Sequence, residues 1–210
     1  MAHALAKDAI NSKIDEIGLE EGLKTLGLNT VSVQSQIQDA NEYLKNPAKG
    51  RVLNEESLLK LEGLNEKNAD LCIILADGLS ANAVNIHSIN LLKLLIQQLK
   101  GWTIAPIVLA KYSRVALSDQ IGEVLKSRIA LILIGERPGL SSPNSMGAYL
   151  TYHPKTGNTD EKRNCVSNIQ PEGLNYELAA IKIAYLLQEM RSKRISGVQL
   201  KDEHNDTYLK

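Results

Sequence analysis

Three short and almost entirely apolar segments constrain the fold of this chain more than any other feature. They occupy residues 70–78, 103–113 and 128–139, and segments with helical periodicity at 80–101 and 118–127 separate them. Continuous apolar runs of this length are typical of strands that are buried on both faces. Strands that alternate with helices build a parallel sheet with helices on both faces. We therefore expect an α/β fold with a parallel sheet that helices cover on both faces.

Capping residues support these helices. Ser80 can accept hydrogen bonds from the first amides of the long helix, and either Ser118 or Asp119 can do so for the short one. Later in the chain, residues 148–154 look like a further strand and residues 164–169 could be strand or loop. The segment "NYELAAIKIAYLLQEMRSKRISG" (175–197) predicts one more amphipathic helix.

The first third of the chain is polar and reads as helical. We predict amphipathic helices over residues 3–15 and 31–47, and a third helix that begins at Asn54 or Ser57 and ends at Gly63. The predicted organisation is a helical region at 1–69, an α/β domain at 70–200 and a polar tail at 201–210.

Composition excludes several classes of protein. Lys plus Arg and Asp plus Glu number 24 each, so the chain lacks the basic surface expected of a nucleic-acid binder. The one basic run, "RSKR" at 191–194, would complement the dipole at a helix C-terminus. Cys72 and Cys165 have no metal-ligand spacing and suggest no disulfide framework. No signal peptide or run long enough to span a membrane is found, so we expect a cytoplasmic protein.

The loops after the three predicted parallel strands are the candidate ligand site. They cover residues 77–80, 111–115 and 136–139, and they meet at the carboxyl edge of the sheet, where open α/β sheets bind ligands. The first loop has one glycine in place of Gly-x-Gly-x-x-Gly, and no P-loop occurs, so NAD and ATP are disfavoured. Glu136 at the end of a strand either binds a ligand or pairs with Arg137.

Two nucleophilic chemistries deserve comparison. "GLSAN" (78–82) is close to the nucleophile elbow Gly-x-Ser-x-Gly, but Asn82 replaces the last glycine, and nothing ties His153 to Ser80 as a base. Cys165 is a second possible nucleophile, without a local base. The helix cap is the favoured interpretation of Ser80, and a small buried apolar residue that of Cys165.

Several motifs together are more specific than any one. They are "ADGLSA" (76–81), "YSRV" (112–115), "SDQIGEVL" (118–125), "GERPGL" (135–140) and "CVSNI" (165–169). In this combination they resemble the small, or light, subunit of ethanolamine ammonia-lyase, over about residues 3–197 and including "HALAKDAI" near the start.

The resemblance implies a subunit of an adenosylcobalamin-dependent lyase that converts ethanolamine to acetaldehyde and ammonia. The large subunit of that family is a TIM barrel that carries the catalytic residues. The small subunit is Rossmann-like and encloses the corrin at the interface of a hetero-oligomer. The resemblance thus implies that residues 70–200 are a Rossmann-like, cobalamin-binding domain and that the helical region 1–69 is partner-docking. The family's cobalamin-binding positions correspond to Val115, Glu136 and Cys165, and the resemblance implies no catalytic residue and no metal ligand in this chain.

The residues agree with that expectation. Apolar contact from Val115, an acceptor from Glu136 and backbone donors from glycine-rich loops suit a corrin with amide side chains. No Asp-x-His-x-x-Gly motif occurs, so we expect the cofactor to keep its own dimethylbenzimidazole on cobalt.

One departure concerns the start of the chain. Family members carry more sequence before the "HALAKDAI" stretch, including an extension linked to packaging in a bacterial microcompartment, so we expect packaging of this chain to be doubtful. The alternatives are a free-standing flavodoxin-like module that binds a small ligand, and a stand-alone hydrolase.

Overall fold

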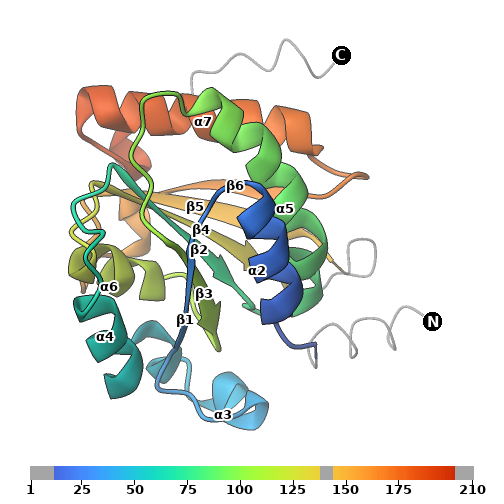
Figure 1. The fold of residues 1–210 in the computed structure, drawn as a ribbon, viewed down its shortest axis with the longest axis vertical. Coiled ribbons are helices and arrows are strands. Elements are labelled where there is room, and N and C mark those ends of the chain that lie inside the picture. The colour runs from blue at the N-terminus through green and yellow to red at the C-terminus, as the bar shows by residue number, and fades with distance from the viewer. Residues whose placement is uncertain (1–11, 138–143, 202–210) are drawn as a thin grey trace.

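A central sheet covered by helices on both faces forms the framework of the protein (Figure 1). The computed structural model describes residues 12–137 and 144–201. This architecture confirms the predicted α/β class.

The sheet has six strands, in the order β1-β3-β2-β4-β5-β6. They are β1 (Thr30–Gln34), β2 (Leu71–Ala76), β3 (Ile107–Lys111), β4 (Ile129–Gly135), β5 (Met146–Tyr152) and β6 (Arg163–Ile169). The first four run parallel, as predicted for β2, β3 and β4. β5 pairs in the antiparallel sense with both β4 and β6, so the whole sheet is mixed, and the segment 164–169, predicted as strand or loop, is a strand.

The helices divide between the two faces. They are α2 (Glu16–Thr25), α3 (Ala40–Lys45), α4 (Glu55–Glu62), α5 (Ala81–Gln98), α6 (Leu117–Val124) and α7 (Tyr176–Lys193), with short 3₁₀ turns η1 (Lys49–Arg51), η2 (Asp160–Lys162) and η3 (Gly197–Gln199). One core joins α2, α5 and α7 to one face of the sheet. A second core joins α4 and α6 to the other face, and Figure 1 shows the two groups on opposite sides.

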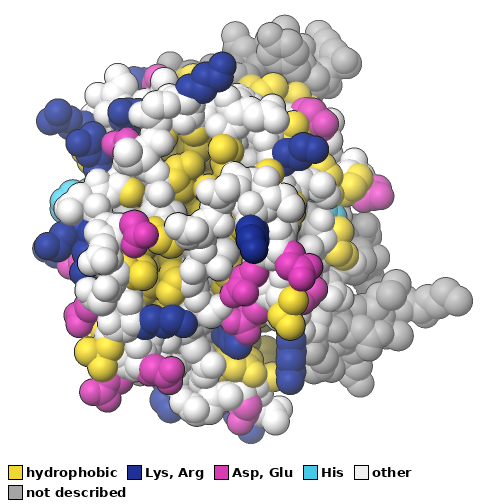
Figure 2. Space-filling model, viewed as in Figure 1, with side chains coloured by type: hydrophobic (Ala, Val, Ile, Leu, Met, Phe, Trp, Pro, Cys, Tyr) yellow, Lys and Arg dark blue, Asp and Glu magenta, His cyan; other side chains and the backbone are white. Residues whose placement is uncertain are grey.

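The alternation of side chains along the strands produces these two cores. In β2, Ile73 and Leu75 face α5 and α7, whereas Cys72 and Ile74 face α6, and all four are fully buried. A strand whose neighbours cover both faces needs apolar residues at every position, which explains the uninterrupted sequence pattern. Charged side chains of both signs are interspersed with small hydrophobic patches on the face seen in Figure 2.

The prediction of one helix over residues 31–47 was wrong. Val31 and Val33 are buried, alternate with half-buried positions and form β1, which pairs with β3. Two-residue alternation of β-branched side chains favours a strand, and it competed with the helical spacing of later residues. The helix α3 begins afterwards, where the Asp39 carboxylate accepts hydrogen bonds from two backbone N–H groups of its first turn.

Region 1–69 therefore contributes a strand to the sheet as well as helices. The predicted helix at 3–15 falls mostly outside the described residues, and residues 12–15 are not helical. The tail beyond residue 201 is also outside them. The division into a region at 1–69 and a domain at 70–200 stays a prediction.

The predicted caps met different outcomes. Asn54 and Gly63 are the N-cap and C-cap of α4, as expected, and the Asn54 side chain accepts a hydrogen bond from the Ser57 N–H. Ser80 occupies the N-cap position of α5 but makes no capping bond; instead the Asn82 N–H donates to the Ser12 hydroxyl at 3.1 Å.

The short helix α6 starts one residue before the predicted Ser118. Its N-cap is Ala116, which makes no side-chain capping bond. Of the two predicted caps, Ser118 donates its hydroxyl to the Val115 carbonyl oxygen at 2.8 Å, and Asp119 forms a buried ion pair with Arg163. Among the described residues, none of the helices has the length and apolar character that crossing a membrane requires.

Candidate functional site

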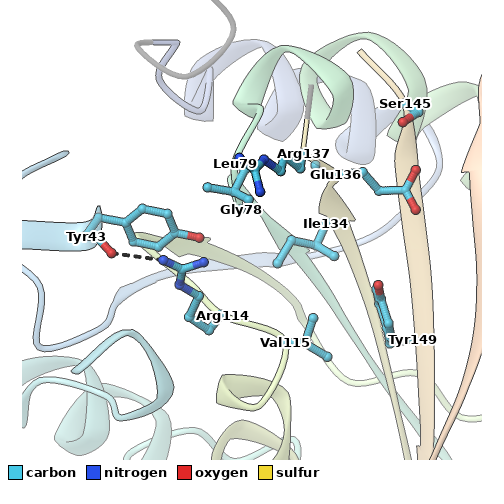
Figure 3. A pocket seen from close by; sticks show the side chains of 11 residues that line it. Tyr43, Gly78, Leu79, Arg114, Val115, Ile134, Glu136, Arg137, Ser145 and Tyr149 are labelled. Atoms are coloured by element: carbon cyan, nitrogen blue, oxygen red, sulfur yellow. Dashed lines mark hydrogen bonds between the residues drawn. The ribbon is translucent and has the colours of Figure 1, made fainter. Parts of the chain in front are cut away.

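The carboxyl edge of the sheet carries an open cavity of about 450 Å³. The helix α5 leaves β2 on one face and α6 leaves β3 on the other, so the connecting loops diverge and leave a crevice. The cavity is lined by Tyr43, Gly78, Leu79, Arg114, Val115, Ile134, Gly135, Glu136, Arg137, Ser145 and Tyr149 (Figure 3). The predicted loops therefore do meet at one site.

Asp77 fixes the two loops that begin at β2 and β3. Its Oδ2 accepts a hydrogen bond from the Tyr112 N–H at 2.6 Å, and its Oδ1 accepts from the N–H groups of Ser113 at 3.0 Å and Gly78 at 2.8 Å. Burial raises the pKa of this carboxyl to about 6, although the three N–H donors oppose the rise. The apolar strand ends before Asp77 and Gly78 because the Asp77 side chain organises the neighbouring loop.

Two glycines let the loops after β2 and β4 touch. Gly78 has a left-handed backbone with a φ of 58°, and a Cβ there would lie 2.4 Å from the Gly135 carbonyl oxygen. A Cβ on Gly135 would lie 2.0 Å from the Ser80 carbonyl oxygen. The Leu79 N–H donates to the Gly135 oxygen at 3.1 Å. The loops from three parallel strands thus form one connected wall.

Val115 lies on this wall, next to a side chain that ties it to α3. The Arg114 guanidinium stacks on the Tyr43 ring, 4.1 Å from its centre, and donates to the Tyr43 carbonyl oxygen at 3.0 Å. The Tyr43 hydroxyl donates in turn to the Ser113 carbonyl oxygen at 2.9 Å. Burial raises the pKa of this hydroxyl, so it stays protonated. The loop that presents Val115 is therefore held from two sides.

Glu136 projects from the end of β4 toward the last two strands. Its Oε2 accepts a hydrogen bond from the Asn168 N–H at 3.1 Å. No ion pair joins Glu136 to Arg137, and Figure 3 shows the two side chains pointing apart. A Cβ on Gly147 would lie 3.0 Å from Oε1, so the missing side chain makes room for the carboxylate. Of the two roles considered for Glu136, pairing with Arg137 is wrong.

Cys165 lines an adjoining cavity of about 320 Å³. It is exposed rather than buried as expected, and it stands opposite Tyr149 in the β5–β6 ladder. The surrounding protein partly desolvates the thiol and raises its pKa, although the Tyr149 hydroxyl acts against this rise. Arg114, Val115 and Tyr149 line both cavities, so all three predicted site residues lie along one depression.

A buried ion pair supports the wall next to Cys165. The Arg163 guanidinium contacts the Asp119 carboxylate, and each side chain is only 2% exposed. Arg163 also reaches Asp160 at 2.8 Å. Burial raises the pKa of Asp119, and the adjacent guanidinium opposes that effect. This contact ties β6 to α6 beneath the second cavity.

The nucleophilic alternatives find no support in the geometry. Ser80 follows β2 and is fully buried, whereas His153 follows β5, whose last residue Tyr152 pairs with the first residue of β4. The two side chains therefore belong to opposite edges of the sheet. Cys165 has a raised pKa, while a cysteine nucleophile needs a lowered one. Within the described ranges, no group of His, Cys, Asp and Glu could hold a metal ion.

Several residues of the site escaped the sequence analysis. Tyr43, Tyr149 and Arg163 come from segments far from the predicted loops and reach the site only through tertiary packing. Arg114 stands beside Val115 in the "YSRV" motif, and its position there was the one available signal.

Comparison with known proteins identifies the family. The family model described as ethanolamine ammonia-lyase light chain matches residues 1–201. The chain is 46% identical over 207 residues to the ethanolamine ammonia-lyase small subunit of Azotobacter vinelandii, an alignment that covers 96% of this chain and 77% of that protein. It is also 46% identical to the same subunit of Pseudomonas putida strain GB-1, with 96% of this chain and 76% of that one covered. The chain belongs to the ethanolamine ammonia-lyase light chain family.

Proposed function

We propose that this chain is the small subunit of an adenosylcobalamin-dependent ethanolamine ammonia-lyase and binds the cobalamin at its interface with the large subunit. Family membership supports the lyase, and the relatives' name, small subunit, implies a larger partner. One observation carries the cofactor proposal: Val115, Glu136 and Cys165 line two adjoining cavities, which share Arg114, Val115 and Tyr149.

The chemistry of these cavities fits a corrinoid. Leu79, Val115 and Ile134 offer apolar surface to a macrocycle, and Glu136 offers a carboxylate to its amide N–H groups. No described residue other than Asn168 donates to that carboxylate, so it can accept further bonds. Arg114 lines both cavities, and its buried Nε has no hydrogen-bond partner among the described residues. Unpaired buried donors of this kind favour a polar ligand.

In this proposal, the residues of this chain bind and position the cofactor and take no part in the reaction itself. When bound, the cofactor supplies a cobalt–carbon bond whose homolysis starts the conversion of ethanolamine to acetaldehyde and ammonia. Glu136 would hold an amide of the corrin periphery, Val115 would contact the ring, and Cys165 would contact its edge from β6. The wall organised by Asp77 keeps these groups in place before binding, which lowers the cost of ordering them.

The open side of the depression is the place for the partner. We propose that a TIM-barrel large subunit covers it and supplies the catalytic residues, since the residues around the cavities include no base matched to a nucleophile. That packaging of this chain in a microcompartment is doubtful stays a prediction. The alternative, a free-standing module that binds a small ligand, would require binding without any partner.

The decisive experiment measures cobalamin binding to the reconstituted complex. The chain is co-expressed with a large subunit, adenosylcobalamin is titrated, and ethanolamine deamination is assayed for each subunit and for the complex. We expect activity in the complex alone. Glu136→Ala should weaken cobalamin binding about tenfold or more, because a hydrogen bond to a charged group contributes about 1.5–3 kcal/mol.

A matched variant separates this effect from a general change in charge. Glu21 is an exposed carboxylate on α2, and Glu21→Ala should leave the cobalamin affinity unchanged. Equal affinity of the Glu136→Ala complex and the parent complex would refute the role of Glu136. Tight cobalamin binding by the chain alone would instead support the free-standing module.

A further inference from the structure

A separate cavity of about 400 Å³ opens at the opposite edge of the sheet, where β2 and β4 begin. Three arginines line it: Arg128 before β4, Arg191 in the last turn of α7 and Arg194 just after that helix. Asp70 is the one carboxylate among its lining residues. The lining therefore carries three positive charges against one negative charge.

The single carboxylate fixes two of the arginines. Asp70 is 8% exposed, and its Oδ2 accepts hydrogen bonds from the Thr103 N–H at 3.1 Å and hydroxyl at 3.0 Å. Arg128 lies 3.3 Å from Oδ1, and Arg191 lies 3.9 Å from Oδ2. Burial acts to raise the pKa of Asp70, but the bonds to Thr103 and the two arginines bring it below its usual value. Asp70 is thus an ionised anchor that orients both guanidinium groups.

Aromatic packing orients the second arginine further. The Arg191 guanidinium carbon lies 4.8 Å from the centre of the Trp102 ring, and Tyr152 forms another part of the wall. A planar guanidinium held on an aromatic face keeps its edge N–H groups available for a ligand. Residues 191–194 are predicted to complement the helix dipole, but Arg191 also contacts Asp70 and Trp102, which lie outside its own helix.

The third arginine is available to a ligand. Arg194 has a left-handed backbone with a φ of 58° at the C-cap of α7, a conformation usually taken by glycine or asparagine. No described residue forms an ion pair or a side-chain hydrogen bond with its guanidinium, and the residue is exposed. Its neighbour Lys193 behaves differently, since it pairs with Glu189 on the same helix.

We propose that this cavity binds a multivalent oxyanion, namely the phosphate or diphosphate group of a small organic molecule. Guanidinium groups bind such groups through paired, charge-assisted hydrogen bonds. The cavity is larger than a phosphate needs, and Trp102, Ile129 and Tyr152 offer apolar surface to the rest of the molecule. The net charge of the lining residues favours a dianion over a monoanion.

Inorganic pyrophosphate is a direct probe of the site. Trp102 is the only tryptophan of the chain and lines the cavity, so its fluorescence should report binding to the purified full-length protein. Isothermal titration calorimetry gives the affinity independently. We expect saturable binding that weakens as salt rises, because charge–charge attraction is screened.

Two variants distinguish binding within the cavity from attraction to positive charge in general. Arg194→Gly removes a lining guanidinium and places the residue that best suits a left-handed C-cap, so folding should not suffer. It should weaken pyrophosphate binding about tenfold or more, from the loss of a charge-assisted hydrogen bond. Lys193→Ala removes a charge one residue away that does not line the cavity, and it should keep the parent affinity. The proposal is overturned by absence of saturable binding, by parent affinity in Arg194→Gly, or by equal losses in both variants.

Discussion

The buried pair of Asp119 and Arg163 offers a quantitative test of how the site is held together. Both side chains are 2% exposed, and the remaining acidic partner of Arg163 is Asp160, whose side chain is 92% exposed. Asp119→Leu would leave a buried guanidinium supported chiefly by a surface carboxylate, which contributes at most about 1 kcal/mol. Removing one partner of a buried ion pair costs about 3–5 kcal/mol.

The size of the chain converts this cost into a measurable shift. For a domain of roughly this length, each kcal/mol lowers the Tm by about 2–4 °C, so Asp119→Leu should lower it by about 6–20 °C. Urea unfolding, followed by the fluorescence of the single Trp102, would give the free energy of unfolding directly.

A double variant tests whether Asp119 and Arg163 stabilise the protein as a pair. Arg163→Met should be as damaging as Asp119→Leu, because it leaves the carboxylate buried without its partner. Combining the two removes both charges, and it should restore a large part of the loss, since apolar replacement of a buried pair is often neutral. A coupling energy of about 2 kcal/mol or more is expected from the four free energies of unfolding. Additive losses in the double variant, or single losses below about 1 kcal/mol, would refute the assigned role.

Three further changes test the rest of the framework. Because the pKa of Asp77 is about 6 in the folded protein and ordinarily 3.8, its charged form is disfavoured by folding, and its contribution to stability is lost as pH rises from about 4 through 6. In urea titrations, the free energy of unfolding of Asp77→Asn minus that of the parent should therefore rise by up to about 3 kcal/mol between pH 4 and pH 7. A difference that stays constant or falls would contradict this. Gly135→Ala places a Cβ against the Ser80 carbonyl and should cost about 2 kcal/mol or more, read as a lower Tm; an unchanged Tm would show that the loops separate freely. Asn175→Ala removes the side chain that caps α7 and should cost about 1 kcal/mol in the same assay, whereas no loss would mean that water replaces the cap.

The centre of the fold could be predicted from the sequence because its signals are local. β2 and β4 are uninterrupted apolar runs, and α5 and α7 are long enough for their periodicity to be unambiguous. β1 has only five residues, and the apolar residues that follow it happen to continue at helical spacing. A short edge strand is recognisable mainly through its pairing partner, here β3, which lies more than 70 residues later.

The candidate site was predictable in position but not in detail. The order of strands and helices places the loops after β2, β3 and β4 together, whatever their side chains do. The contacts that orient the side chains depend on distant residues: the Tyr43 carbonyl accepts from Arg114, and the Asn168 N–H holds Glu136. The Ser12 hydroxyl likewise replaces the expected Ser80 cap. No local pattern contains such information, because each contact exists only after the sheet has formed.

These long-range contacts also explain why the wall of the depression acts as a unit. Asp77 joins the loop after β2 to the loop after β3, and the contact of Gly78 with Gly135 joins it to the loop after β4. A displacement of the loop after β2 must therefore break hydrogen bonds to both of the others. A ligand that contacts Val115 and Glu136 meets groups whose relative positions are already fixed, so little of its binding free energy is spent on ordering them. Under the proposed function, a large subunit would close the open side of this depression.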